Sequence, residues 1–333
     1  MDMVFKKYNS IEQNYRTKFI DMIKANNLDT IDYIVQEKIH GSNFSFISVD
    51  GINFRAAKRT SILEPNESFY NYKPVMDKLL DKMKALWTLV KADYPDMFQL
   101  TVFGELFGGL YPHPEVKKDN TASVIQKGVY YSPSNNFYAF DIMINAEVYL
   151  DVDIINNYFE KVNMFYARTI YRGSLTDCLN YPNDFQSTIP EQLGLPPIEN
   201  NIIEGIVIRP IKSLYLPIGS RVILKSKNEK WSEIKTKKKK TQTPIISNDL
   251  KLCILNVKNY ITKNRLNNVI SHIGEINKNK IGAVLKLFSQ DVISDFRKDY
   301  PIYDKLNKKD QTILRKEINK EVIKEVKLIY LNN

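Results

Sequence analysis

Hydrophobic residues recur along this chain with two different periods, which separate a strand-rich part from a helical part. Continuous or alternating apolar runs predict strands, and helical spacing predicts helices over 9–27 and 73–92. Strands without regular alternation of strand and helix favour an α+β fold built on antiparallel sheets. The predicted strands span residues 31–38, 44–49, 52–58, 98–106, 137–144, 202–209 and 221–227.

Two connections in the first part carry their own signals. Asp50-Gly51 predicts a hairpin between the second and third strands, because the tight turn requires a positive φ. Residues 107–136 are rich in Pro, Gly, Asn and Ser and predict a long loop or insertion.

The pattern changes near residue 235, where a lysine-rich run with no apolar anchor begins. Beyond it the spacing is helical throughout. We therefore predict a larger domain over 1–234, a basic linker over 235–248 and an all-helical domain over 249–333. Lys237–Lys240 can serve either to bind a polyanion or only as a solvated linker.

Charge and composition narrow the class of protein. The 333 residues carry a formal net charge of +10, which favours a polyanionic partner, although a basic surface can also serve solubility alone. No run reaches the roughly 18 apolar residues of a membrane span. The first residues lack the apolar core of a signal peptide, and Cys178 and Cys253 form no close pair. These features predict a cytoplasmic protein, and the many Lys, Asn and Ile residues fit a viral or phage source.

A single lysine is the first candidate for chemistry. In Glu37-Lys38-Ile39-His40-Gly41-Ser42-Asn43-Phe44, Lys38 ends an apolar run just before a glycine turn. A lysine that is desolvated and crowded by other cations is more often uncharged, and the free amine can attack phosphorus. The short motif also arises by chance, so its significance depends on the rest of the chain.

Groups that such chemistry needs stand at the ends of later strands. Lys58-Arg59 closes the hairpin after Lys38, and Glu105 follows Val102-Phe103-Gly104. Phe140-Asp141 lies within a strand that can present the phenyl ring to a base. The simpler interpretations are an exposed hairpin end, a surface glutamate and a core phenylalanine.

Two further features are harder to explain as structure alone. Glu204 interrupts the apolar run Ile203–Ile208, and buried carboxylates are rare unless they are paired or bind metal. Lys225 and Lys227 share one face of a strand at period two, which suits a polyphosphate.

Taken in order, these motifs resemble those of the covalent nucleotidyltransferases, which include DNA ligases, RNA ligases and mRNA capping enzymes. The form Glu-Lys-Ile-His-Gly-Ser-Asn-Phe resembles the RNA ligase 2 family of bacteriophage and its relatives, the kinetoplastid RNA-editing ligases. DNA ligases and capping enzymes have Asp at the position of His40. Ser42 stands where Thr is more usual, and residues 108–131 are longer than in the compact phage enzymes, with contacts that the sequence leaves open.

The resemblance implies ATP-dependent joining of RNA 3′-hydroxyl and 5′-phosphate ends, at nicks in duplex RNA and in RNA repair. It implies a lysyl–AMP intermediate on Lys38, Mg²⁺ or Mn²⁺ at Glu204, and action as a monomer. The remaining implied roles are catalysis by His40, Glu204, Lys225 and Lys227; contact with ATP or AMP by Glu37, Asn43, Arg59, Glu105, Phe140 and Asp141; and handling of the RNA end by Asn43, Arg59, Arg265 and Asp291.

Two alternatives stay open at this point. The chain can be a capping guanylyltransferase or DNA ligase of the same superfamily, against which His40 and the helical tail argue. It can also be a catalytically silent RNA-binding protein, against which the full set of expected residues argues.

Overall fold

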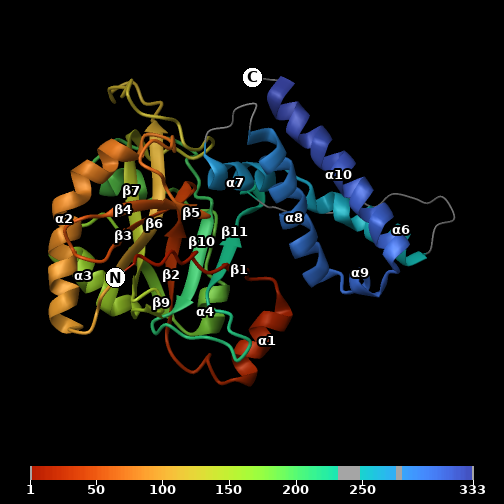
Figure 1. Cartoon of the computed structure of the whole chain (residues 1–333), viewed down its shortest axis with the longest axis horizontal. Coiled ribbons are helices and arrows are strands. Elements are labelled where there is room, and N and C mark those ends of the chain that lie inside the picture. Colours follow the sequence, from red (N-terminus) through yellow and green to blue (C-terminus); the bar gives the residue numbers. More distant parts are fainter. Residues whose placement is uncertain (1, 232–247, 275–279, 332–333) are drawn as a thin grey trace. The chain divides into compact units, whose positions relative to one another are not determined.

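The computed structural model describes residues 2–231, 248–274 and 280–331 (Figure 1). The chain divides into two compact units, Met1–Lys230 and Trp231–Asn333, each with its own hydrophobic core. The division falls just before the predicted domain end at residue 234. The predicted linker lies outside the described residues except for residue 248, where a helix begins.

The first unit is built on two sheets, which confirms the predicted α+β class. Their strand orders are β1-β11-β10-β2-β9 and β5-β4-β3-β6-β7-β8, and every neighbouring pair is antiparallel except β1 with β11. The strands are β1 (Glu12–Gln13), β2 (Tyr33–Lys38), β3 (Ser42–Ser48), β4 (Arg55–Lys58), β5 (Ser61–Ile62), β6 (Leu100–Leu110), β7 (Ser132–Ile144), β8 (Val148–Tyr149), β9 (Thr169–Gly173), β10 (Gly205–Pro210) and β11 (Leu224–Lys227). The helices of this unit are α1 (Thr17–Ala25), α2 (Tyr72–Asp93), α3 (Val152–Lys161), α4 (Leu175–Leu179) and α5 (Ile189–Gln192).

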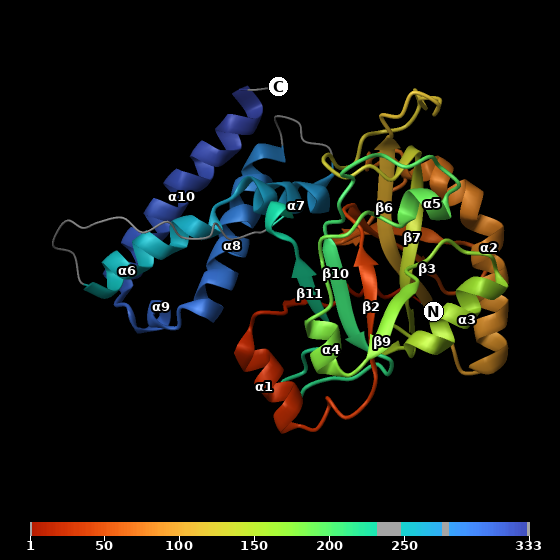
Figure 2. The same cartoon turned by 180° about the vertical axis from the view of Figure 1, so that it is seen from behind.

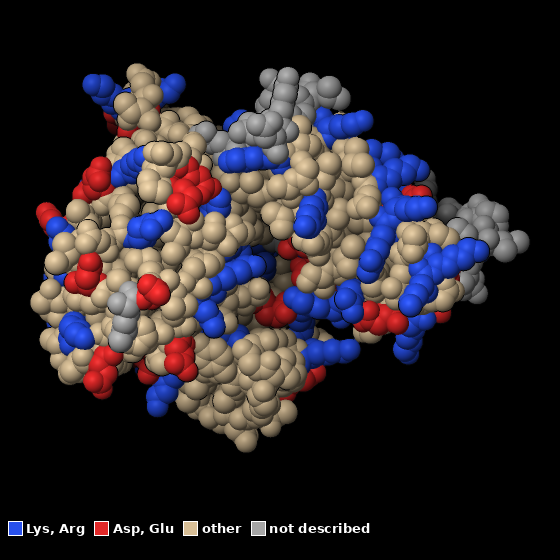
Figure 3. Space-filling view, viewed as in Figure 1, with Lys and Arg blue, Asp and Glu red and all other residues tan. Residues whose placement is uncertain are grey.

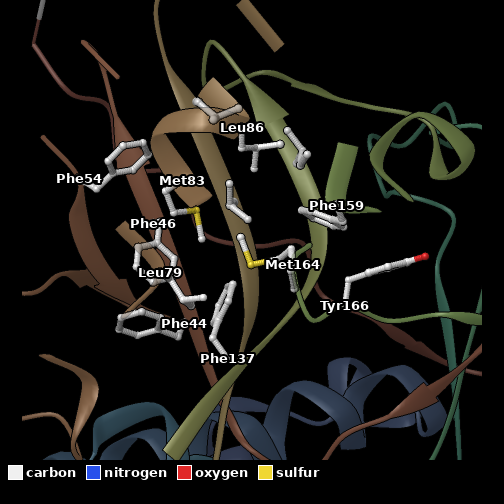
Figure 4. Close-up of a cluster of buried hydrophobic side chains, with 14 of the residues drawn as sticks. Phe44, Phe46, Phe54, Leu79, Met83, Leu86, Phe137, Phe159, Met164 and Tyr166 are labelled. Carbon is white, nitrogen blue, oxygen red and sulfur yellow. The ribbon is translucent and has the colours of Figure 1, made fainter. Parts of the chain in front are cut away.

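Helix α2 packs on the six-stranded sheet and forms the main core. Leu79, Met83 and Leu86 recur at helical spacing and point toward the sheet, where Phe46 and Phe137 meet them (Figure 4). This is the apolar stripe that the sequence predicts for a helix over 73–92. The packed face gives the sheet a rigid back, so that its other face is available to line a site.

Two of the predicted segments differ in the structure, and β5, β8, β9 and the helices α3, α4 and α5 were not predicted. Residues 9–27 do not form one helix, because Glu12–Gln13 pair with Leu224–Lys225 as a parallel edge strand and α1 starts only at Thr17. The predicted long loop is also shorter. Gly108 and Gly109 adopt φ angles of +91° and +92°, which let β6 continue through a bulge to Leu110.

The second unit is helical in its described part, as predicted. Its helices are α6 (Asn248–Val257), α7 (Lys263–Ile273), α8 (Ile281–Asp299), α9 (Ile302–Lys305) and α10 (Lys308–Leu331). Lys and Arg side chains are dense over this unit (Figure 3). Over the described residues of the chain, no helix is both long and apolar enough to cross a membrane.

Candidate active site

A pocket opens between the two sheets of the first unit, and it gathers many of the predicted site residues. The pocket holds about 540 Å³ of empty space, including open solvent. The predicted residues in its lining are Glu37, Lys38, Asn43, Arg59, Glu105 and Phe140.

Strand register places Lys38 in this pocket. In the five-stranded sheet β10 lies between β2 and β11 (Figure 2). Lys38 on β2 lies opposite Gly205, which lies opposite Lys227 on β11. Directly opposed residues of antiparallel strands project on the same face. The two lysines, far apart in sequence, therefore face the same side of the sheet. A Cβ at position 205 would lie 2.1 Å from the carbonyl oxygen of Ser226, so this close approach of the strands requires glycine.

The same strand register places Lys225 on the pocket side of the sheet. It lies opposite Val207, and Val207 lines the pocket. The two lysines of β11 are both half-buried and share the pocket face, as their period of two predicts.

Glu204 holds the centre of a buried ion cluster. Its Oε2 atom is 2.7 Å from Lys38 Nζ and its Oε1 atom is 2.8 Å from Lys227 Nζ, while only 2% of its side chain is exposed. Burial opposes the charged form of this carboxyl. Lys227 and Lys38, with a smaller contribution from His40, outweigh that effect and hold its pKa well below the usual value. Glu204 is therefore a carboxylate that holds both ammonium groups in place.

His40 is the third partner of this carboxylate. Its Nδ1 atom lies 3.4 Å from Glu204 Oε2. Burial lowers the pKa of His40, although Glu204 acts in the opposite direction. The imidazole is therefore mainly neutral at pH 7 and adds little charge to the cluster.

Glu105 is half-buried and presents its carboxyl to the pocket. It lies opposite Asn43 across β3 and β6, and its Oε2 atom is inaccessible to solvent with no hydrogen-bond partner among the described residues. Burial raises its pKa to about 8, although Lys38 and Arg59 act in the opposite direction. The group is mainly protonated at pH 7, and a protonated carboxyl can donate a hydrogen bond to a sugar hydroxyl.

We predict that Glu105→Gln stabilises the protein increasingly as the pH rises from 5 to 9. The wild-type carboxyl has a raised pKa in the folded state, so folding becomes less favourable above its unfolded value of 4.5 and the full cost is reached above about 8. Glutamine does not titrate. Thermal unfolding at several pH values should show that the free energy of unfolding of the variant exceeds that of the wild type by an amount that grows with pH. This amount should approach a few kcal/mol, since one pKa unit is about 1.4 kcal/mol. A difference that does not change with pH would contradict this assignment.

Phe140 reaches the pocket through a bulge in β7. Phe103 pairs with Asp141 and Gly104 pairs with Ala139, so Phe140 is the extra residue between them. Its ring packs edge-on against Tyr8 at 5.0 Å, and both rings line the pocket. A bulge re-aims a side chain in this way near many ligand sites.

Asp141 lies behind the pocket and does not line it. It is fully buried and accepts hydrogen bonds from Tyr8, Arg209 and Arg221. Arg209 also donates to the Phe140 carbonyl at 3.1 Å and lines the pocket. The charge of Asp141 holds two arginines and a tyrosine, and contact of Asp141 with a nucleotide stays a prediction.

Glu37 lines the pocket, but its carboxylate is bound within the protein. Its carboxylate is bound by the Ser187 hydroxyl at 2.6 Å and by the Thr188 N–H at 2.9 Å. The side chain is 2% exposed. Contact of Glu37 with a nucleotide stays a prediction.

Arg265 and Asp291 belong to the helical unit. The Arg265 guanidinium is buried and forms ion pairs with Asp291 at 2.6 Å and Asp295 at 2.9 Å. Asp291 is the more accessible partner, with 43% of its side chain exposed. The pair links α7 to α8, and direct contact of either residue with RNA stays a prediction.

Several pocket residues were not predicted. Gln36 could have been found, because it stands two positions before Lys38 on the same strand face. The pocket positions of Tyr8 and Arg209 were not predicted, since they depend on Asp141 from a distant strand. The other unpredicted lining residues are Ile11, Ile39, Tyr138, Ala167, Val207 and Ile223.

This pocket, with a lysine held beside a carboxylate and a second lysine, is the arrangement expected of the covalent nucleotidyltransferase class. Residues 31–227 match the family model described as RNA ligase, and residues 244–324 match the one described as T4 RNA ligase 2 C-terminal. The chain belongs to the RNA ligase family, and the second match supports its RNA ligase 2 branch.

The relatives include two mitochondrial proteins of Trypanosoma brucei brucei. RNA-editing ligase 1 is 32% identical over 223 residues, which cover 58% of this chain and 48% of that protein. RNA-editing ligase 2 is 28% identical over 356 residues, which cover 89% of this chain and 84% of that protein. The chain thus spans about half the length of the first relative. A Naegleria gruberi RNA ligase mutant solved with ATP and Mn has a TM-score of 0.42 at 14% identity, covering 68% of this chain and 57% of that one, which is too distant to bear on the fold.

Proposed function

We propose that this protein is an ATP-dependent RNA ligase that acts through a lysyl–AMP intermediate. Family membership supports this function. The observation that carries it is the position of Lys38, which lines the pocket while its Nζ atom contacts Glu204.

The proposed reaction has three steps. Lys38 Nζ loses a proton and attacks the α-phosphorus of ATP, so that an N–P bond forms and the P–O bond to pyrophosphate breaks. The RNA 5′-phosphate then attacks the same phosphorus and releases the lysine as AMP moves to the RNA end. Finally the RNA 3′-hydroxyl attacks the 5′-phosphate, the phosphodiester forms, and AMP leaves.

The residues of the pocket support this chemistry by binding and orientation. Phe140 can stack on the base, and the protonated Glu105 can donate to the ribose. Lys225 and Lys227, on the same strand face as Lys38, can neutralise the α-phosphate. His40 assists the first step in this proposal. Asn43 and Arg59 contact the AMP phosphate and the RNA end.

The residues of the site accommodate a divalent ion best when the ion is coordinated by ATP. Both oxygens of Glu204 already carry an ammonium group, and the described residues include no group of three or more His, Cys, Asp or Glu that could hold a metal. An ion bound directly to Glu204 would have to displace one ammonium. We therefore propose Mg²⁺ or Mn²⁺ held by ATP phosphates and water, where it would neutralise phosphate charge.

The finer substrate is also a proposal. A basic chain with a dense basic helical unit suits a duplex, and the family resemblance of the motifs favours a nick with a 3′-hydroxyl and a 5′-phosphate. We propose RNA repair inside the cell by a monomer, with Arg265 and Asp291 shaping the helical surface near the RNA end.

We expect the protein to seal a nick in duplex RNA with ATP and a divalent metal, and to seal nicked DNA far more slowly. Denaturing gels of end-labelled strands measure the joined product. Sealing of DNA at the same rate as RNA would contradict the assigned substrate. Labelling of the protein by GTP and not ATP would instead indicate a guanylyltransferase.

A further inference from the structure

The segment between β6 and β7, residues 111–131, contacts the turn that contains Lys38. This turn, residues 38–41, is called the nucleophile turn below. The phenol oxygen of Tyr131 accepts a hydrogen bond from the His40 backbone N–H at 2.9 Å. The Gln126 side-chain amide donates to the Gly41 carbonyl at 3.3 Å. The segment therefore holds two successive residues of the nucleophile turn by their backbone.

The preceding residue joins the same segment to the chain before Glu204. The Tyr130 N–H donates to Asn201 Oδ1 at 2.8 Å, and Asn201 Nδ2 donates to the Tyr130 carbonyl at 2.6 Å. Asn201 is 5% exposed and stands shortly before Glu204. Two adjacent tyrosines thus hold the chain on both sides of the ion pair between Lys38 and Glu204.

The surroundings of Tyr131 fix its hydroxyl in place. The residue is 2% exposed, and its ring packs edge-to-face on Phe107 at 5.8 Å and 89°. Burial, with Glu37 adding to it, raises the pKa of Tyr131 well above its usual value. The hydroxyl is therefore neutral and rigidly placed as an acceptor for a buried N–H.

We propose that Tyr131 is a positioning residue for the attack of Lys38 on ATP, acting through the His40 N–H to hold the nucleophile turn in place. The inference rests on the proposed ligase function. Tyr131 does not line the pocket, so its effect falls on the rate of the chemical step and not on the affinity for ATP. Small misplacements of reacting groups are costly, up to about 100-fold in rate.

Tyr131→Phe tests this role, because it removes only the hydroxyl and keeps the ring. Tyr111→Phe is the matched control in the same segment, since the Tyr111 hydroxyl donates to the Pro196 carbonyl instead. We expect the maximal rate of lysyl–AMP formation in Tyr131→Phe to fall by about 10-fold. The ATP concentration at half-maximal rate should be unchanged, and Tyr111→Phe should behave as wild type.

Backbone amide hydrogen exchange at His40 reports on the hydrogen bond to Tyr131 independently of catalysis. We expect it to be faster in Tyr131→Phe and unchanged in Tyr111→Phe. An unchanged maximal rate in Tyr131→Phe, an equal loss in Tyr111→Phe, or a loss confined to ATP affinity would overturn the positioning role. Unchanged exchange at His40 would overturn the contact itself. A wild-type protein that never forms the adduct would overturn the proposed function instead.

Discussion

Asp141→Asn is expected to lower the free energy of unfolding by about 3–5 kcal/mol at neutral pH, because it leaves two buried cations without their counter-charge. Asp141 is fully buried, with Arg221 at 2.5 Å and Arg209 at 3.2 Å. Arg221 in turn lies over the ring of Tyr149 at 3.8 Å. Asparagine keeps the volume but not the charge.

The pH dependence of this effect has a defined sign. Burial opposes the charge of Asp141, but Arg209 and Arg221 hold its pKa below the usual value of 3.8. The stabilisation is therefore present above pH 3.8 and is lost as the pH falls through the folded value. Urea unfolding of the two proteins should show a difference that is full at pH 7 and shrinks in acid.

Asp32→Asn provides the matched control. Asp32 forms an ion pair with Arg172 at 2.9 Å, but 54% of its side chain is exposed. Exposed pairs contribute about 0–1 kcal/mol, so this variant should unfold close to wild type. Equal losses in the free energy of unfolding of the two variants would contradict the stabilising role of the buried Asp141 cluster.

Asp141→Asn should also weaken binding of ATP. Arg209 is held by Asp141 and donates to the Phe140 carbonyl, and both Arg209 and Phe140 line the pocket. Loss of the anion releases these two side chains together. The energetics of the buried cluster and the shape of the pocket are therefore linked.

Much of the site could be predicted from local sequence because its residues stand in distinctive contexts. Lys38 at a strand end, Glu204 within an apolar run and the paired lysines at 225 and 227 are each unusual alone. The five-stranded sheet alone brings Lys38, Glu204 and Lys227 together at bonding distance, through the register of β2, β10 and β11. Their order along the chain is what made the set specific.

What the sequence could not show depends on pairing between distant strands. The bulge at Phe140 exists only relative to β6. The burial of Asp141 depends on Arg209 from β10 of the other sheet and on Arg221 from the segment before β11. The carboxylate of Glu37 is taken by Ser187 and Thr188, which no periodicity connects to it. Local patterns identify the residues, whereas register decides which of them reach the pocket.

Lys38→Ala is expected to abolish formation of lysyl–AMP and hence all sealing that starts from ATP. The covalent intermediate is the bond between the Lys38 Nζ atom and phosphorus, and alanine has no amine that could form it. Lys38→Arg is a stringent companion, since it keeps a cation beside Glu204 but its guanidinium does not give up its proton. Lys58→Ala is the control, because Lys58 pairs with Glu67 and does not line the pocket.

The most direct measurement is to incubate the full chain with α-labelled ATP and a divalent metal, and then to map the adduct by mass spectrometry. We expect one AMP group on Lys38, acid-labile and removed by pyrophosphate, present in Lys58→Ala and absent from both Lys38 variants. An adduct on another residue, or one that persists in Lys38→Ala, would contradict the account.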